Sequence, residues 1–229
     1  RDSIESDWQK TKDGAISVGI YNSLQLSRQL QGVNKKLGQA ISYAISAGII
    51  KGKTGEVTRV VGKKGLVVYV YGMGKKGNLN PESLRVSSAA VAKACINDKI
   101  NSVAFLMPAE VKDLASSQAT AEGLVLGSYQ FNEFKTTRDD ISLLESASIV
   151  GGDKKSIEKG SVIANSVCFA RDLENRPGNI ATPSHLAEHA KKIGKSSLVK
   201  VTIFERDKFT KMGMGALSGV ASGTEEPPK

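Results

Sequence analysis

The sequence predicts an α/β protein in which a mixed or parallel sheet carries helices on both faces, followed by the start of a second α/β unit. Runs of β-branched residues alternate with helical patterns along the first part of the chain, as βαβ units require. A polar, glycine-rich stretch at residues 151–155 (GGDKK) then interrupts the pattern. We therefore expect one domain over residues 1–150 and an incomplete second domain over residues 151–229.

The first elements predict a strand, a helix and a hairpin. Residues 15–21 (AISVGIY) have the composition of a strand, and a long helical pattern covers about residues 24–47. Residues 56–61 and 66–71 are rich in β-branched side chains, and the sequence GKKG between them is typical of a hairpin turn.

The next elements predict a further alternation of helices and strands. Pro81 opens a helix, and residues 103–107 supply a short apolar strand after it. A helical pattern follows over about residues 110–135, and residues 141–150 (ISLLESASIV) resemble another strand.

Beyond the junction, a helix is expected over about residues 162–173. Thr182 can cap the next helix, which has Pro183 at its first position and extends to Gly194. The remaining predictions are a strand at 199–204, a short helix at 207–212 and a strand at 216–221.

Composition favours a folded cytoplasmic protein. The chain is 40% hydrophobic and 24% charged, which is typical of soluble globular proteins. No apolar run reaches the roughly 18 residues of a membrane span, and no signal peptide is evident, so we expect no membrane partner. Cys95 and Cys168 lack CxxC spacing and are expected to be reduced core thiols. Because the chain begins with Arg1 and ends on Pro-Pro-Lys, we expect it to be a fragment or a processed product.

The net charge of +9 is concentrated in one region. Residues 51–100 contain 10 Lys or Arg against 3 Asp or Glu, whereas residues 101–150 contain 3 against 7. Much of the basicity lies in two glycine-bounded turns, with lysines at Lys63, Lys64, Lys75 and Lys76. Solvated turn tips explain them most simply, and contact with nucleic acid is the minority hypothesis.

Residues 72–77 (GMGKKG) match the GxGxxG pattern directly after a predicted strand, which is one feature of dinucleotide-binding turns. The rest of the context does not fit. The helix opens only near Pro81, and no acidic residue follows the next strand before Glu110. A basic turn is therefore favoured over a nucleotide site.

Residues 185–189 (HLAEH) match HxxEH, in which two histidines hold zinc and the glutamate moves a proton. These are the only histidines in the chain, and a zinc peptidase needs a third ligand, so a solvated helix face is favoured. No GxSxG elbow occurs, which argues against a serine hydrolase. The acidic pairs at 139–140 and 225–226 are expected to be solvated rather than catalytic.

Four motifs together resemble the leucyl (cytosol) aminopeptidases, a two-metal peptidase family. The family pattern EGxxLxxYxFxx(F/Y)K is matched late in the first domain, and patterns similar to ARDLxNxPxN, TPxxLA and LGMGA-to-EPP follow in the family's order. The matching stretches are 121–135 (AEGLVLGSYQFNEFK), 170–179 (ARDLENRPGN), 181–187 (ATPSHLA) and 212–217 (MGMGAL) up to 226–228 (EPP). More loosely, residues 71–76 (YGMGKK) look like the family's GLGKK-type turn.

The resemblance implies a macro-domain-like N-terminal α/β domain, the truncated start of a catalytic peptidase domain, and a hexamer built from two trimers. It also implies an enzyme that releases N-terminal residues, leucine among them, from peptide substrates. In that family two divalent metal ions, usually zinc, manganese, magnesium or cobalt, bridge the attacking hydroxide.

The resemblance also implies where the catalytic residues lie. The family's ligand motifs follow the EPP segment, so we expect the catalytic and metal-binding residues downstream of Lys229. None of them maps onto residues 1–229. This chain alone is therefore expected to bind no catalytic metal and to be inactive.

Two further hypotheses stay open beside the enzyme. Some bacterial relatives also bind DNA, which the basic turns would suit. A macro-like domain could bind an ADP-ribose-type ligand, although no acidic adenine-reading residue supports this.

Overall fold

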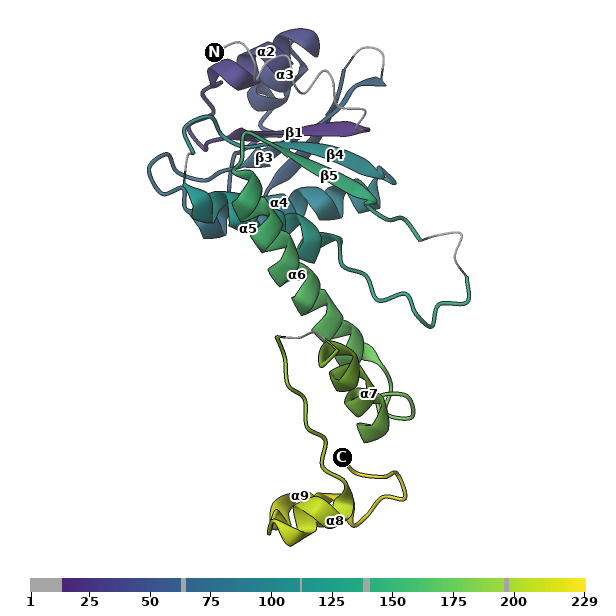
Figure 1. Ribbon diagram of the computed structural model, residues 1–229. Helices are drawn as coiled ribbons and strands as arrows, with labels where there is room; N and C mark the ends of the chain where they lie inside the picture. Colours follow the sequence, from purple (N-terminus) through teal and green to yellow (C-terminus); the bar gives the residue numbers. More distant parts are fainter. Residues whose placement is uncertain (1–13, 63–64, 112, 138–140, 196–197) are drawn as a thin grey trace. The chain divides into compact units, whose positions relative to one another are not determined.

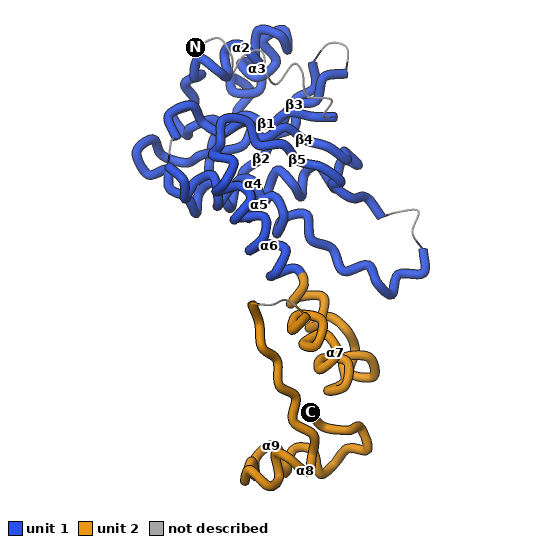
Figure 2. The backbone as a smooth tube through the Cα atoms, in the orientation of Figure 1, with its two compact units in different colours: residues 1–168 blue, residues 169–229 orange. Residues whose placement is uncertain are grey.

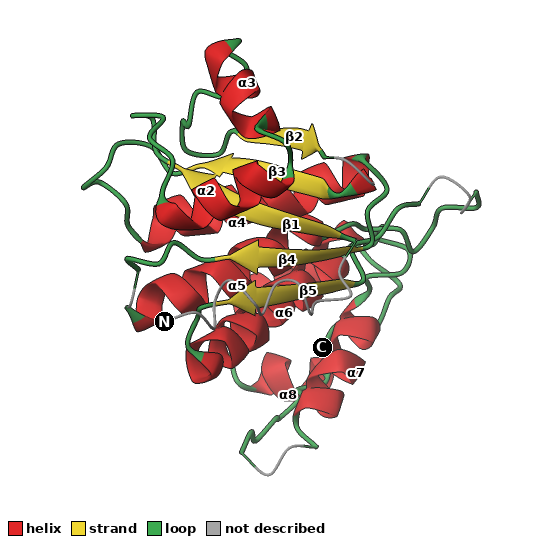
Figure 3. Ribbon diagram, turned by 90° about the horizontal axis from the view of Figure 1, so that it is seen from above, coloured by secondary structure: helices red, strands yellow, loops and turns green. Residues whose placement is uncertain are grey.

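The computed structural model describes residues 14–62, 65–111, 113–137, 141–195 and 198–229 (Figure 1). The chain forms two compact units, residues 1–168 and residues 169–229, which are coloured separately in Figure 2. Within the described residues of the first unit, five strands form one sheet in the order β2-β3-β1-β4-β5 (Figure 3). The predicted mixed sheet is thereby confirmed.

The sheet is parallel except at one edge. Its strands are β1 (Ala15–Ile20), β2 (Val57–Val61), β3 (Val67–Gly72), β4 (Ser102–Leu106) and β5 (Ser146–Val150). Strand β1 pairs in parallel with both β3 and β4, and β5 pairs in parallel with β4. Only β2 runs antiparallel, against β3, so the predicted hairpin is correct. Strand β5 is shorter than predicted because its ladder is limited to the five residues of β4.

Helices cover both faces of the sheet, as Figures 1 and 3 show. Helices α2 (Arg28–Lys36) and α3 (Ala40–Ser46) lie on one face, and α4 (Pro81–Asn97) and α5 (Leu114–Ser128) lie on the other. Alternate residues of each strand enter separate cores: Val68 and Val70 pack toward α2 and α3, and Tyr69 and Tyr71 pack toward α4 and α5. Both faces are therefore apolar, as parallel strands require.

The single helix predicted over residues 24–47 is wrong, because the chain breaks between α2 and α3. Gly38 and Gln39 both have positive φ, +63° and +68°, which no continuous helix permits. The buried Asn34 stabilises the break: its Oδ1 accepts hydrogen bonds from the backbone nitrogens of Ile41 and Ser42, at 3.0 and 3.2 Å. A side chain of one helix thus caps the next.

Helix α5 is shorter at both ends than the predicted range of 110–135. Asp113 caps its start, where the Ser116 nitrogen donates to the carboxylate at 2.7 Å. Tyr129 adopts an extended conformation, and Gln130 Nε2 then donates to the Ser142 carbonyl at 2.7 Å. This hydrogen bond ties the segment after α5 to the segment that precedes β5.

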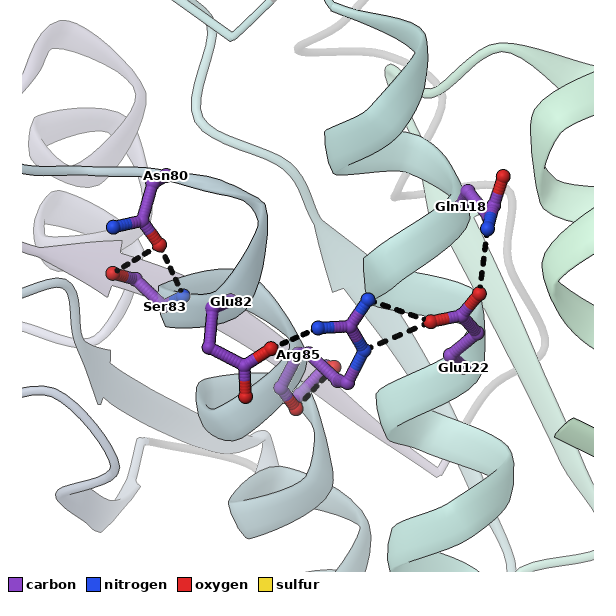
Figure 4. A network of polar contacts seen from close by, with 7 residues as sticks. Asn80, Glu82, Ser83, Arg85, Gln118 and Glu122 are labelled. Atoms are coloured by element: carbon purple, nitrogen blue, oxygen red, sulfur yellow. Dashed lines mark hydrogen bonds and ion pairs between the residues drawn. The ribbon is translucent and has the colours of Figure 1, made fainter. Parts of the chain in front are cut away.

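Helices α4 and α5 cross closely and share an ion pair (Figure 4). Nε and Nη2 of Arg85 donate to one carboxylate oxygen of the buried Glu122, at 2.8 and 2.7 Å, and Gln118 donates to the other at 2.7 Å. Arg85 also pairs with Glu82 on its own helix. A β-carbon on Gly123 would lie 2.2 Å from the Arg85 carbonyl oxygen, so the crossing requires glycine there.

The second half of the chain is helical in its described residues. Its helices are α6 (Lys154–Asn175), α7 (Pro183–Ile193), α8 (Arg206–Lys211) and α9 (Gly215–Ala221). The Thr182 cap of α7 and its end at Gly194 are confirmed, as is the short helix α8. No helix within the described ranges is both long and apolar enough to cross a membrane.

Two predicted strands in this half are wrong. Residues 199–204 have no regular secondary structure, and within the described part of the chain no strand pairs with them. Residues 216–221 form most of helix α9, whose last carbonyl, that of Ala221, accepts a hydrogen bond from Arg206 Nη2 at 3.1 Å. A short apolar run suits either structure, and contact with α8 favours the helix.

Candidate functional site

A cleft of about 920 Å³ opens at the carboxyl ends of the parallel strands in the first unit. Strand β1 lies between β3 and β4. The helix that follows β1 covers one face of the sheet, whereas the helices that follow β3 and β4 cover the other, so the connections diverge on either side of β1. Open α/β sheets bind ligands at such switch points. The cleft is lined by segments that follow β1, β3 and β4, among them Tyr21, Ser27, Lys76, Glu110 and Asp113.

The polar side chains of the cleft are largely engaged with one another or with helix ends. Tyr21 donates its hydroxyl proton to Glu110 Oε1 at 2.6 Å. Burial, then the hydrogen bond and negative charge of Glu110, raise the pKa of Tyr21 well above its ordinary value. The hydrogen bond from Ser116 lowers the pKa of the Asp113 carboxyl that caps α5. The cleft suits binding of a polar molecule. Among the described residues of its lining, the one hydroxyl paired with a carboxylate is Tyr21, whose raised pKa makes it a poor nucleophile.

The GxGxxG turn at residues 72–77 is explained by backbone packing. A β-carbon on Gly72 would lie 2.0 Å from the Lys53 carbonyl oxygen, and Gly74 and Gly77 have positive φ, +75° and +93°. The Gly74 nitrogen donates to the Gly52 carbonyl at 2.9 Å. Helix α4 begins only at Pro81, which confirms the expected distance between the turn and the helix. These glycines shape a turn, and the ADP-ribose-type ligand stays a prediction.

Two of the four lysines in the minority hypothesis of nucleic-acid contact lie in the described part of the chain. Lys75 and Lys76 are exposed in the turn after β3, and Lys76 lines the cleft. Lys63 and Lys64 lie outside the described residues.

The nucleic-acid hypothesis therefore stays a prediction with a direct test. If these lysines contact phosphates, replacing all four by glutamine should weaken binding of a DNA duplex. The slope of log affinity against log salt concentration should also become shallower, by the equivalent of up to about four phosphate contacts. Fluorescence anisotropy at several salt concentrations measures both. An unchanged affinity and slope would dismiss the hypothesis.

The two histidines of the HxxEH pattern converge within the second unit. Their Nε2 atoms lie 3.2 Å apart, and Arg176 Nη1 lies 3.2 Å from Nε2 of His185 and 3.4 Å from Nε2 of His189. The ring of Phe169 lies 5.5 Å from that of His189. Desolvation, followed by the positive charges of His185, Lys192 and Arg176, lowers the pKa of His189. Both imidazoles are half-buried, so the expectation of a simply solvated face is wrong.

Other reactive groups are poorly placed for catalysis. Burial and the neighbouring Asp98 charge raise the pKa of the Cys95 thiol to about 12, so it is an inert core residue, as predicted. Cys168 is half-buried, less enclosed than expected. Across the described ranges, no three His, Cys, Asp or Glu side chains gather closely enough to hold a metal ion, so a two-metal centre does not fit these residues.

The last residue of the sequence, Lys229, has a structural contact in the second unit. Its Nζ lies 2.5 Å from Oε2 of Glu205, the residue that precedes helix α8. Lys229 also lines the apolar groove between α7 and α8. These contacts give it a packing role, and the expectation that the catalytic and metal-binding residues follow Lys229 stays a prediction.

The fold defines an α/β protein with a cleft at the switch point of a mixed sheet and a second, helical unit. Family models match both parts. The N-terminal domain of the cytosol aminopeptidase family matches residues 18–138, and the catalytic domain of that family matches residues 168–229. The first match alone covers more than half of the chain, and the chain therefore belongs to the cytosol aminopeptidase family, as its motifs indicated.

Curated relatives extend the similarity over nearly the whole chain. A probable cytosol aminopeptidase of Aquifex aeolicus is 30% identical over 234 aligned residues, which cover 99% of this chain and 46% of the relative. One from Nostoc punctiforme is 33% identical, covering 94% of this chain and 45% of the relative. The chain thus spans somewhat less than half the length of the curated relatives that it matches.

Solved structures share the fold. A mutant of tomato leucine aminopeptidase is 28% identical with a TM-score of 0.79, covering 96% of this chain and 47% of that one. The bottromycin maturation enzyme BotP, also solved in complex with Mn, has a TM-score of 0.75 at 20% identity and supports the fold alone. It covers 94% of this chain, and this chain covers 44% of BotP, or 43% in the Mn complex.

Proposed function

We propose that this chain contributes the N-terminal domain and the first elements of the catalytic domain to a metal-dependent aminopeptidase, which releases N-terminal residues of the leucine type from peptides. The observation that carries the proposal is the order of the two family matches, N-terminal domain at 18–138 and catalytic domain at 168–229. The similarity to tomato leucine aminopeptidase supports it. On this view the domains divide at residues 151–155, where a glycine-rich turn precedes helix α6.

The enzyme would use two divalent metal ions, zinc or manganese, to acidify a bridging water and to polarise the peptide carbonyl. The described residues do not gather a ligand set for such a pair. We assign no catalytic or metal-binding role to this segment in the proposed reaction, and the family resemblance supports ligands beyond Lys229. The resemblance also supports a cytoplasmic homo-hexamer.

The proposal predicts activity in the natural-length protein and none in this chain by itself. We expect the full-length protein to have about twice the mass of this 24.3 kDa chain, since the aligned relatives extend well beyond it. It should hydrolyse a leucyl chromogenic substrate in added Mn²⁺ and lose at least about 90% of that rate with a chelator, because the metal pair supplies the nucleophile.

Intact mass and hydrolysis rate, with and without chelator, check this prediction together. The 229-residue chain assayed in parallel is the matched control and should show only background hydrolysis. Chelator-resistant activity in the natural-length protein would contradict the two-metal mechanism, and absence of any leucyl hydrolysis would contradict the assigned activity.

A further inference from the structure

The histidine pair on α7 has a geometry that goes beyond the proposed function. His185 and His189 are four positions apart, so their side chains project from the same face of the helix. Their Nε2 atoms are 3.2 Å apart. Two imidazole nitrogens bound to one tetrahedral ion at 2.0–2.1 Å would be separated by about 3.3 Å. The side chains already hold the spacing of two ligands of one ion.

The arginine beside the pair indicates which atoms carry the lone pairs. A guanidinium only donates hydrogen bonds and does not lose its proton in proteins. Arg176 Nη1 carries two N–H groups and lies within 3.4 Å of both Nε2 atoms. If it donates to both, both Nε2 atoms are acceptors and each ring proton is on Nδ1. Two imidazole lone pairs then converge on one point next to a positive charge.

Among the described residues, the groups that can fix the tautomer of the His185 ring are Arg176 and Nε2 of His189, both at its Nε2. Its Nδ1 is buried and has no hydrogen-bond partner among the described residues, so the group at Nε2 decides which nitrogen carries the proton. The His189 ring lies 5.5 Å from that of Phe169, Ala187 of α7 is buried, and Leu186 and Ala190 line an apolar groove with Phe209. The two rings are therefore carried by a helix that is partly packed within the second unit.

The geometry points to a two-imidazole binding site for a divalent cation of the Ni²⁺, Cu²⁺ or Zn²⁺ class, formed by His185 and His189 and guarded by Arg176. Imidazole nitrogen suits these ions, whereas Mg²⁺ and Ca²⁺ prefer oxygen. The guanidinium takes the place of the ion when none is bound and must swing away when one enters. Water would complete the coordination, since the site has two protein ligands.

Direct titration of the full 229-residue chain with Ni²⁺, without a polyhistidine tag, tests the site. The chain contains only these two histidines, so every imidazole signal in its proton NMR spectrum comes from the pair. Paramagnetic Ni²⁺ at one equivalent should broaden both sets of imidazole resonances selectively. Sharp imidazole resonances with Ni²⁺ bound would overturn the proposal, because the ion would then be held elsewhere, for example by a cysteine thiol.

Equilibrium dialysis of three variants gives opposite expected shifts. H185N and H189N should each weaken Ni²⁺ affinity by at least tenfold, because a single remaining imidazole cannot chelate the ion. R176Q should strengthen it by about tenfold, since it removes a like charge from a position close to the ion. The matched control K191Q, at an exposed position of the same helix whose charge is not among those that shift the pKa of His189, should stay within about twofold.

None of these measurements depends on peptide hydrolysis. A negative result would therefore refute the cation site without bearing on the proposed aminopeptidase activity. Equal affinities for wild type, H185N and H189N would refute the site. An R176Q affinity equal to or below that of wild type would refute the guarding role of the arginine. The NMR titration uses the unmodified chain and decides the question even if a histidine variant does not fold.

Discussion

Replacing Gly123 by alanine is expected to destabilise the sheet-containing unit by about 2 kcal/mol or more. In an isolated helix this change would gain about 1 kcal/mol of helix propensity. Here the new β-carbon would lie 2.1 Å from Ser88 Oγ and 2.2 Å from the Arg85 carbonyl oxygen. The serine hydroxyl can rotate away, but the carbonyl belongs to the backbone of α4, so the two helices must separate. The packing cost therefore exceeds the gain in propensity.

Urea unfolding of the full chain, followed by circular dichroism, measures this change. Gly14→Ala is the matched control, because a β-carbon there would meet its nearest neighbours at 3.4–3.6 Å, which is ordinary contact. The control should change the free energy of unfolding by less than about 0.5 kcal/mol. A Gly123→Ala protein as stable as wild type would mean that α4 and α5 do not cross as closely as described.

The second large effect is expected at the ion pair between α4 and α5. Arg85→Met keeps most of the side-chain stem. Among the described residues it leaves the Glu122 carboxylate, whose side chain is 8% exposed, with Gln118 as its one side-chain donor. Removing one member of a buried pair costs about 3–5 kcal/mol. Because Arg85 itself is 32% exposed and water can enter, we expect about 2–4 kcal/mol.

A double variant separates the unpaired charge from lost packing. Arg85→Met combined with Glu122→Leu removes both charges and should recover at least about half of the loss, since no buried carboxylate remains. Glu122→Gln alone should cost less, about 1 kcal/mol, because its amide oxygen still accepts from Arg85. A double variant less stable than Arg85→Met would show that the pair acts through packing rather than through charge.

Glu122 and Gly123, the two positions discussed above on α5, show what part of the family pattern does in the structure. Glu122 and Gly123 open the stretch that resembles the aminopeptidase family, and neither lines the cleft. Glu122 anchors α5 to α4 through Arg85, and Gly123 allows the two helices to approach. This part of the pattern is therefore structural.

Local sequence was sufficient to predict an element wherever its hydrophobic pattern agreed with the capping or turn residues at its ends. Thr182 and Pro183 specified the start of α7, and GKKG between two β-branched runs specified the β2–β3 hairpin. The alternation of strands and helices predicted the α/β class, because an apolar strand buried on both faces needs helices to cover it. The family could be recognised because its motifs recur in order along the chain.

The remaining features depended on contacts between residues far apart in the sequence. The break at residues 38–39 exists because Asn34 can cap a second helix, and the length of β5 is set by β4. The run at 216–221 became a helix beside α8, since a short apolar run has no intrinsic preference. The sequence by itself determined the class, the family and the histidine spacing. Only the tertiary structure brought Arg176 to that pair and Arg85 to Glu122, because a charged side chain acquires its partner when the chain packs.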